Sequence, residues 1–494
     1  MTDGDAGSVA ERLKGEGSAM RIMLELPNEP ALRAAYRAAI RDPERGLASL
    51  GRLLPRQLDI GGTKFKIASL PSYSHKFRSS GRRLKSAAAA ARRAEERLPS
   101  LVFSLEVEGI ETLDRFVDAA RQVPGARAGI DLPIAVFDAW CPEGDQPSLF
   151  HTRDAASALI DVDALRSHVP SLRGQGVNVV MVDLGLNAAA LAAFSPGAEV
   201  AGAWEVSQGG APLWQTGSGP AAWSGHGTMV ARNVLSVAPR VRLFDFPLLP
   251  EQVTEVTGWT SWAHAALHQV QADIQTWLSA EFPGPWVFCN AWGIYDRRQE
   301  SAPVHHPGNY TGNPTHLLNL LVGAIDAAGF DQIFAAGNGG QFCPHPLCGP
   351  GDTGPGNSIF GASSHGDVLT VGAVRPDGMW IGYSSQGPGQ LAFRTPATPF
   401  SEKPDLCAPS HFIEAADASA LCSGTSAACG IAAGAVAALR GAGSPHASKQ
   451  TSELRDHLRA TARKPADAAS EFDIRYGHGL LDLRAALREP LQSS

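Results

Sequence analysis

From about residue 172 onward the sequence alternates continuous apolar runs with helical or loop segments, and this alternation restricts the fold more than any other feature. The apolar runs are VNVVMV, VRLFDF, WVFCNAW, QIFAAG and DVLTVGAV. Uninterrupted apolar runs indicate strands that are covered on both faces, and their alternation with helices is typical of a parallel sheet in an α/β protein. Functional residues of such sheets gather at the carboxyl ends of the strands. We therefore expect an α/β domain over residues 171–490, with its site along that edge.

The first 170 residues have a different texture and contain most of the basic clusters. The stretch GRRLKSAAAAARRAEERL, near residues 81–98, predicts an exposed helix. Beyond it, LVFSLEV and PIAVFDAW predict strands, and ETLDRFVDAARQV between them predicts a helix. A chain of 494 residues is also longer than one core usually serves. We expect residues 1–170 to form a smaller α+β domain with a regulatory, interaction or propeptide-like role.

Composition and charge exclude several kinds of partner. The formal net charge of −7 gives no electrostatic reason to expect binding to nucleic acid. The longest apolar stretch, residues 427–439, is shorter than the roughly 20 residues of a membrane-spanning helix, so no membrane association is expected. The first residues, MTDGDAGSVAERLKGEG, lack the features of a secretory signal. The sequence thus predicts a cytoplasmic protein whose N-terminal domain stays attached in the working molecule.

An aspartate and a histidine stand at positions suited to acid–base chemistry. Asp183 ends the apolar run VNVVMVD, where an acid is commonly a turn or cap residue. His226 lies in SGHGTMVARNVL, between Gly225 and Gly227. These glycines let backbone and substrate approach the imidazole closely. A lone histidine is more often a surface or packed residue, but the HGT triplet at a helix start also suits a general base.

A serine and an asparagine complete the candidate set. Ser426 follows Gly424 and Thr425 and opens a helix of small residues, where serine is ordinarily a cap. The same position directs backbone N–H groups and the positive end of the helix dipole towards an oxyanion beside the hydroxyl. Asn338 follows an apolar strand in QIFAAGNGG, where asparagine is usually a turn residue. Its amide is also suited to donating a hydrogen bond to a transition state.

The four motifs occur in the order Asp, His, Asn, Ser, and the order of the three triad residues is that of subtilisin. On these motifs the chain resembles the subtilase family of serine peptidases over residues 172–488. The segments SVAPRVRLF, GYSSQGP, KPDLCAP and YGHGLLDLRAAL are similar to family segments in the same order. The resemblance implies a three-layer α/β sandwich with a central, mainly parallel sheet.

The resemblance also implies a serine endopeptidase that hydrolyses protein or peptide substrates through an acyl-enzyme intermediate. Ser426 would attack the scissile carbonyl, His226 would carry the proton to the leaving amine, and Asp183 would orient the imidazole. Asn338 and the backbone N–H of Ser426 would bind the oxyanion. These roles follow from the family and not from the spacing of the residues.

The family would further use WVFCNAWG as an extended strand that pairs with the substrate. Ala291, Trp292 and Gly293 would then contact the peptide, with Gly293 near the first specificity pocket. Three departures accompany the match: Leu184 stands where the family usually has Ser or Thr, the serine helix reads AACGIAAG without the usual proline, and Ala291 stands where a polar residue is frequent.

Metals and cofactors receive little support from the sequence. Cys343 and Cys348 flank Pro-His-Pro, and loop thiols, a local disulfide or a zinc site are the alternatives. No second ligand pair with matching spacing accompanies them. Calcium sites are common in the family, but no acidic loop is distinctive enough to assign one. We expect no catalytic metal and no cofactor.

Two alternatives to a general endopeptidase stay open. One is a subtilase scaffold that has lost catalysis and binds proteins, with Leu184 as an early sign of decay. The other is a peptide-maturation enzyme or esterase of narrow specificity. In each case the N-terminal domain is the expected contact for a regulatory partner.

Overall fold

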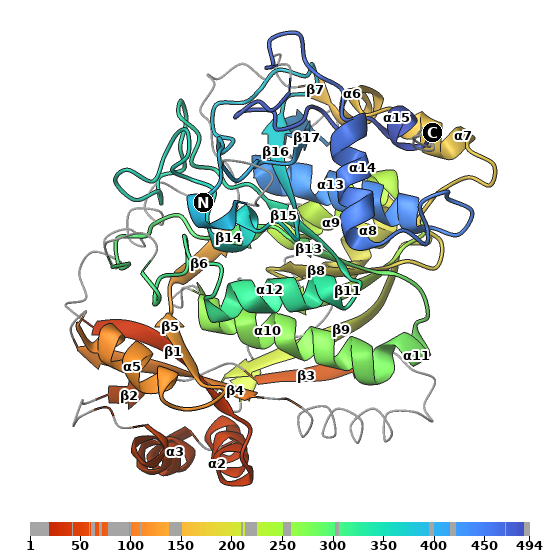
Figure 1. The fold of residues 1–494 in the computed structure, drawn as a ribbon. Coiled ribbons are helices and arrows are strands. Elements are labelled where there is room, and N and C mark those ends of the chain that lie inside the picture. The colour runs from red at the N-terminus through yellow and green to blue at the C-terminus, as the bar shows by residue number, and fades with distance from the viewer. Residues whose placement is uncertain are drawn as a thin grey trace, which may run out of the picture.

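The computed structural model describes residues 19–41, 43–58, 60, 65–68, 72–77, 98, 100–108, 111–137, 151–208, 211–212, 225–249, 258–301, 306–394, 400–414, 421–469 and 471–488. Figure 1 shows the arrangement of the helices and strands. The helix expected near residues 81–98 lies almost entirely outside the described residues.

A large, mainly parallel sheet forms the centre of the molecule. Its strands are β3 (Ser72–Phe77), β8 (Asn178–Asp183), β9 (Glu199–Gln208), β10 (Ala211–Pro212), β11 (Arg242–Pro247), β13 (Trp286–Asn290), β15 (Asp331–Ala335), β16 (Leu369–Val374) and β17 (Leu406–Pro409). Their order is β10-β9-β11-β8-β13-β15-β16-β17, with β3 paired to β9. The pairs from β9 to β17 are parallel, and β3 and β10 run antiparallel to β9. The five apolar runs of the sequence are all strands of this region, which confirms the α/β class.

Helices cover both faces of this sheet. One face packs on α9 (His226–Val237) and α13 (Gly424–Arg440), and the other on α10 (Thr260–Asp273) and α12 (Leu317–Ala327), as Figure 1 shows. Because side chains alternate along a strand, Val179 and Met181 of β8 join the first core while Val180 and Val182 join the second. Burial on both faces explains why the four residues of β8 directly before Asp183 are all apolar.

Smaller elements surround the two cores. The helices are α6 (Arg153–Leu159), α7 (Val162–Ser167), α8 (Ala188–Phe194), α11 (Ser279–Glu281), α14 (Thr451–Thr461), α15 (Leu483–Ala486), the π-helical η2 (Ile274–Leu278) and the 3₁₀ turns η3 (Gly361–Ser364) and η4 (Leu391–Phe393). The strands β7 (His151–Thr152), β18 (Phe412–Ile413) and β19 (Leu421–Cys422) form a small separate sheet. Buried residues of α6 and α7 belong to the core with α9 and α13. Residues 151–170, assigned to the N-terminal domain from sequence, therefore pack with the large sheet.

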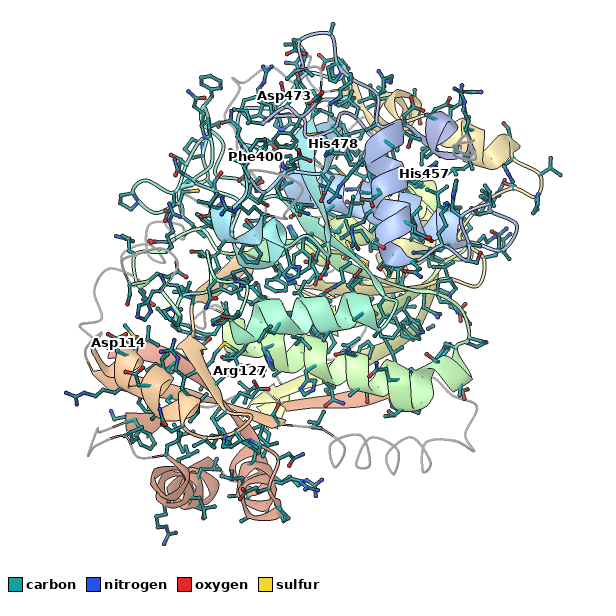
Figure 2. The ribbon with its side chains drawn as sticks, viewed as in Figure 1. Asp114, Arg127, Phe400, His457, Asp473 and His478 are labelled. Carbon is teal, nitrogen blue, oxygen red and sulfur yellow. The ribbon has the colours of Figure 1, made fainter. Side chains whose placement is uncertain are left out.

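The described residues from 19 to 137 are called here the N-terminal unit. Its antiparallel sheet has the order β2-β4-β1-β5, from β2 (Phe65–Ile67), β4 (Ser100–Glu108), β1 (Ala19–Pro27) and β5 (Arg127–Ile130). Its helices are α2 (Pro30–Arg41), α3 (Pro43–Gln57) and α5 (Glu111–Arg121). Asp114 and Arg127 mark this unit in Figure 2, far from His457 on α14. Its apolar residues continue into the core that contains α10 and α12.

One further strand of the unit, β6 (Pro133–Val136), leaves its sheet. It lies between β12 (Gly258–Trp259) and β14 (Trp292–Gly293) and is antiparallel to both. The final strand of the N-terminal unit thus lies among elements of the large domain, where the predicted site residues are found.

A buried histidine at the junction of the two units makes stability depend on pH. The ring of His316 bonds through Nε2 to the carbonyl oxygen of Ile130, 3.0 Å away, and burial lowers its pKa to about 4. Asp131 raises this pKa, whereas nearby His264 is itself held neutral by burial. Between the folded pKa of about 4 and an unfolded value near 6.5, the unfolded chain binds more protons, so acid favours unfolding.

We expect the free energy of unfolding to fall by up to about 3 kcal/mol from this group as the pH decreases from 6.5 to 4. Urea unfolding at several pH values measures the effect. A His316→Gln variant keeps an N–H donor but does not titrate, so its stability should depend less on pH in this range. Equal pH dependence in both proteins would show that His316 contributes nothing to it.

Candidate active site

Asp183 and His226 meet at the carboxyl end of the sheet. Asp183 is the last residue of β8, and His226 is the first residue of α9. Nδ1 of His226 lies 2.6 Å from Oδ1 of Asp183, and both side chains are buried. A Cβ on Gly227 would lie 2.5 Å from the Gly185 carbonyl oxygen. Only glycine therefore lets the first turn of α9 lie this close to the backbone that follows β8. The pair has the arrangement in which a carboxylate orients an imidazole.

The departure at Leu184 is partly offset by the backbone. The N–H of Leu184 donates to Oδ1 of Asp183 at 2.7 Å. The Asp183 carboxylate therefore accepts a hydrogen bond from residue 184, and the donor is the main chain and not a side-chain hydroxyl. The leucine removes a hydroxyl but leaves this donor in place.

Ser426 lies in the first turn of α13, fully buried. Its helix approaches α9 closely: a Cβ on Gly430 would lie 2.6 Å from the carbonyl oxygen of Val230, and one on Gly434 would lie 2.6 Å from that of Val234. The glycines and alanines of α13 thus allow two helix backbones to touch, which holds both helix starts in one place. The small-residue pattern that predicted deep packing is explained by this contact.

Asn338 follows β15 and is buried against the start of α13. Its Oδ1 accepts from the backbone N–H of Thr425 at 3.0 Å and from the Thr425 hydroxyl at 2.9 Å. The same hydroxyl accepts from the N–H of Gly337 at 3.1 Å. These bonds fix the amide so that its Nδ2 points towards the serine side of the site. The bonds of Thr425 to Asn338 could not be predicted from its sequence motif, although Thr425 directly precedes Ser426.

A backbone carbonyl of the N-terminal unit lies between these groups. The carbonyl oxygen of Phe137 accepts from Oγ of Ser426 at 2.8 Å and from Nδ2 of Asn338 at 2.7 Å. Oγ of Ser426 is also 3.2 Å from the carbonyl oxygen of Ala291. The structure thus brings Ser426 and Asn338 together on one peptide group. The only sequence signal for this was the predicted strand PIAVFDAW, which carried no indication of its partner.

The three residues proposed to bind substrate line this segment. Trp292 and Gly293 pair with β6, and the Ala291 carbonyl accepts from the N–H of Phe137 at 3.0 Å. A Cβ on Gly293 would lie 2.3 Å from the Phe137 ring. The ring packs edge-on against Tyr295, with centroids 5.2 Å apart. Gly293 therefore opens the space that the aromatic ring fills.

The cysteine loop beyond Asn338 lies close to the site. Cys343 and Cys348 form no disulfide with each other, and burial raises the pKa of Cys348 to about 12. The His345 ring stacks on Tyr295 at 4.6 Å between centroids. Within the described ranges, no group of three or more His, Cys, Asp or Glu side chains is arranged to hold a metal ion. No helix in those ranges is long and apolar enough to cross a membrane.

The fold and the site define an α/β protein with a paired aspartate and histidine, and with a buried serine at the start of a helix that packs closely on the helix of the histidine. The model of the Subtilase family matches residues 205–479, more than half of the chain. The chain therefore belongs to the subtilase family, which is a family of serine peptidases.

Solved structures with detectable similarity include proteases of a secretion system. One is the crystal structure of MycP1 from the ESX-1 type VII secretion system, which is 17% identical to this chain. The aligned region covers 74% of this chain and 92% of the MycP1 chain, and the TM-score is 0.44. MycP1 from Mycobacterium smegmatis is 18% identical, with coverages of 74% and 91% and a TM-score of 0.43. A search of curated proteins found no match.

Proposed function

We propose that the protein is a serine endopeptidase that cleaves protein or peptide substrates, with Asp183, His226 and Ser426 as its triad and Asn338 as an oxyanion donor. One observation carries the proposal. A peptide carbonyl, that of Phe137, accepts hydrogen bonds from both Ser426 and Asn338 in a segment flanked by two strands. A turn asparagine and a cap serine have no reason to converge on the same carbonyl oxygen.

The geometry supports a defined sequence of steps. His226 accepts the Ser426 proton as Oγ bonds to the carbonyl carbon, and Asp183 stabilises the imidazolium through the 2.6 Å contact. The negative charge develops on the oxygen that faces Nδ2 of Asn338. Collapse breaks the C–N bond, and His226 gives its proton to the leaving amine. Water then hydrolyses the ester, which restores the serine and yields a carboxylate.

We expect peptide hydrolysis by the full chain to be blocked by phenylmethylsulfonyl fluoride and unaffected by chelators. The reason is that the proposed chemistry needs a serine nucleophile and no metal. A fluorophosphonate probe should label the protein, and labelling should be lost in Ser426→Ala and strongly reduced in His226→Ala. Ser279→Ala, which changes an exposed serine on α11, is the matched control and should label like the parent.

Two results would contradict the proposal in different ways. Inhibition by a zinc chelator with inert serine reagents would indicate metal chemistry. A folded protein that neither labels nor cleaves any peptide would indicate a binding scaffold. Labelling without cleavage of casein would instead favour a peptide-maturation enzyme or esterase of narrow specificity.

A further inference from the structure

We propose that Tyr383 and Ser410 are positioning residues for the reaction. Their hydroxyls hold the peptide groups of Gly424, two residues before Ser426, and so fix the nucleophile in place. The inference rests on the proposed function and adds two residues to it that lie outside the triad and the oxyanion donor. Tyr383 lies in the segment GYSSQGP, to which the sequence assigned no role. Both side chains are fully buried.

The two hydroxyls and Gly424 form a closed set of hydrogen bonds, called here the Gly424 clamp. The N–H of Gly424 donates to the Tyr383 hydroxyl at 3.1 Å, and the Ser410 hydroxyl donates to the Gly424 carbonyl oxygen at 2.7 Å. The two hydroxyl oxygens are 2.9 Å apart. Because Ser410 uses its proton on Gly424, Tyr383 donates to Ser410. All three bonds run in one direction, so each polarises and strengthens the next.

Gly424 is a residue whose backbone has to be held. Its φ is +77°, a conformation that glycine adopts without strain. Glycine also has the greatest backbone freedom of all residues, and this one lies with Ser426 in the first turn of α13. A rotation about its dihedral angles would turn the segment that carries the nucleophile. The Gly424 clamp binds both the N–H and the carbonyl of this residue and therefore restricts that rotation.

The backbone of Tyr383 holds the loop of the oxyanion donor as well. Its carbonyl oxygen accepts at 2.8 Å from the N–H of Gly340, which lies two residues after Asn338. A Cβ on Gly340 would lie 2.3 Å from the carbonyl oxygen of Gly382, so the two segments are in backbone contact. Tyr383 thus bonds the asparagine loop through its main chain and the serine helix through its side chain. It links the two groups that have to act on one carbonyl.

The residues of the clamp are themselves anchored on β16 of the central sheet. The N–H of Ser410 donates to the carbonyl oxygen of Val374 at 2.8 Å. The hydroxyl of Ser384, next to Tyr383, accepts from the N–H of Ala373 at 2.9 Å. Ser410 also directly follows β17, which packs beside α13 (Figure 1). Supporting bonds to a packed sheet are what keeps a reacting group in its productive geometry.

Loss of the clamp should affect the chemical step more than substrate binding. A displacement of about 1 Å in a reacting group can cost about 100-fold in rate. The clamp acts on the turn that carries the nucleophile and not on residues 291–293, which are proposed to bind substrate. The expected signature is therefore a lower kcat with a nearly unchanged KM.

The first experiment removes the two hydroxyls from the full chain. Tyr383→Phe and Ser410→Ala should each lower kcat for a chromophoric peptide by about 10- to 100-fold, with KM changed less than about twofold. The double variant should lose little more than Tyr383→Phe alone, because the first change already opens the set of bonds. A fall in kcat below about threefold in both single variants, with an unchanged circular dichroism spectrum, would overturn the inference.

Tyr476→Phe is the matched control. The hydroxyl of Tyr476 is also buried, and it accepts at 3.0 Å from the N–H of Trp380, three residues before Tyr383. The control removes the same atom next to the same segment but leaves the Gly424 clamp intact. Its kcat should change less than about threefold. An equal loss in Tyr476→Phe and Tyr383→Phe would mean that general loosening of the segment lowers activity, and the positioning role would be wrong.

Titration with the fluorophosphonate probe separates positioning from folding. The number of sites that react at completion reports the folded fraction, and the rate of labelling reports how well the nucleophile is placed. In Tyr383→Phe the number of sites should match the parent while the labelling rate falls together with kcat. A loss that disappears when kcat is expressed per titrated site would show a purely structural role. If Tyr383→Phe does not fold, Ser410→Ala, which removes a smaller group, decides the question.

This inference and the proposed function fail differently. If the parent labels at Ser426 and hydrolyses peptides while both single variants retain its kcat, Tyr383 and Ser410 do not position the nucleophile, and the proposed function stands. If the parent neither labels nor hydrolyses any peptide, the proposed function is wrong, and the inference falls with it.

Discussion

Replacing Ser426 by alanine should lower kcat for peptide hydrolysis by about a millionfold, the size of the loss measured for the nucleophile of a subtilisin. Without Oγ there is no ester intermediate, and what is left is the effect of binding and of the oxyanion donors, about 10³- to 10⁴-fold over water. Initial rates with a chromophoric peptide measure the loss.

A double variant sharpens this test. His226→Ala alone should cost nearly as much as Ser426→Ala, and the two together should cost little more, because triad residues act as a unit. Ser279→Ala serves again as the control. A loss below tenfold for Ser426→Ala, with an unchanged circular dichroism spectrum, would show that another group is the nucleophile.

Most of the large sheet could be predicted because its strands carry their own signal. β8 is buried on both faces, so its apolar run identifies it without knowledge of its neighbours. β9 has the sequence EVAGAWEVSQ, and its polar residues interrupt the apolar run that would predict a strand. In the structure it pairs with β3, β10 and β11. Its pairing with β3 joins residues far apart in the chain, and the local pattern does not encode that pairing.

In the candidate site too, residues within short motifs could be predicted from the sequence, whereas a contact between distant segments could not. Asp183, His226, Asn338 and Ser426 each stand in a short motif with glycines or a strand end beside them, so each could be found locally. Phe137 could not, because its partners Asn338 and Ser426 lie 201 and 289 residues away.

The domain boundary near residue 170 stays a prediction, but two helices that precede it contact the core of the large sheet. The helices α6 and α7 read as part of the first domain by position. They pack on the core that contains α9 and α13, and the N–H of Leu483 in α15 donates to the carbonyl oxygen of Ile160 at 3.0 Å. Contacts with the far end of the chain, which the local sequence does not encode, decide where these helices belong.

If Asn338 is an oxyanion donor, its loss should affect kcat but not KM, and the loss in kcat should be smaller than for the nucleophile. Asn338→Ala should lower kcat by about 100-fold to 1000-fold, the range for losing one such donor in a subtilisin. KM should hardly change, because the bond gains strength only when charge develops on the oxygen. Steady-state kinetics on a chromophoric peptide separate the two parameters.

The structure adds a difficulty that two matched variants resolve. Oδ1 of Asn338 also anchors Thr425, so the alanine variant loses a positioning contact together with the donor. Asn338→Asp keeps an oxygen for Thr425 but replaces the donating amide by a second acceptor, so kcat should fall at least as far as in the alanine variant. Thr425→Val removes the hydroxyl contact but keeps the amide, so its loss should be much smaller. If the valine and alanine variants lose the same activity, Asn338 acts by positioning, and if Asn338→Ala loses less than threefold with the fold intact, it is a turn residue.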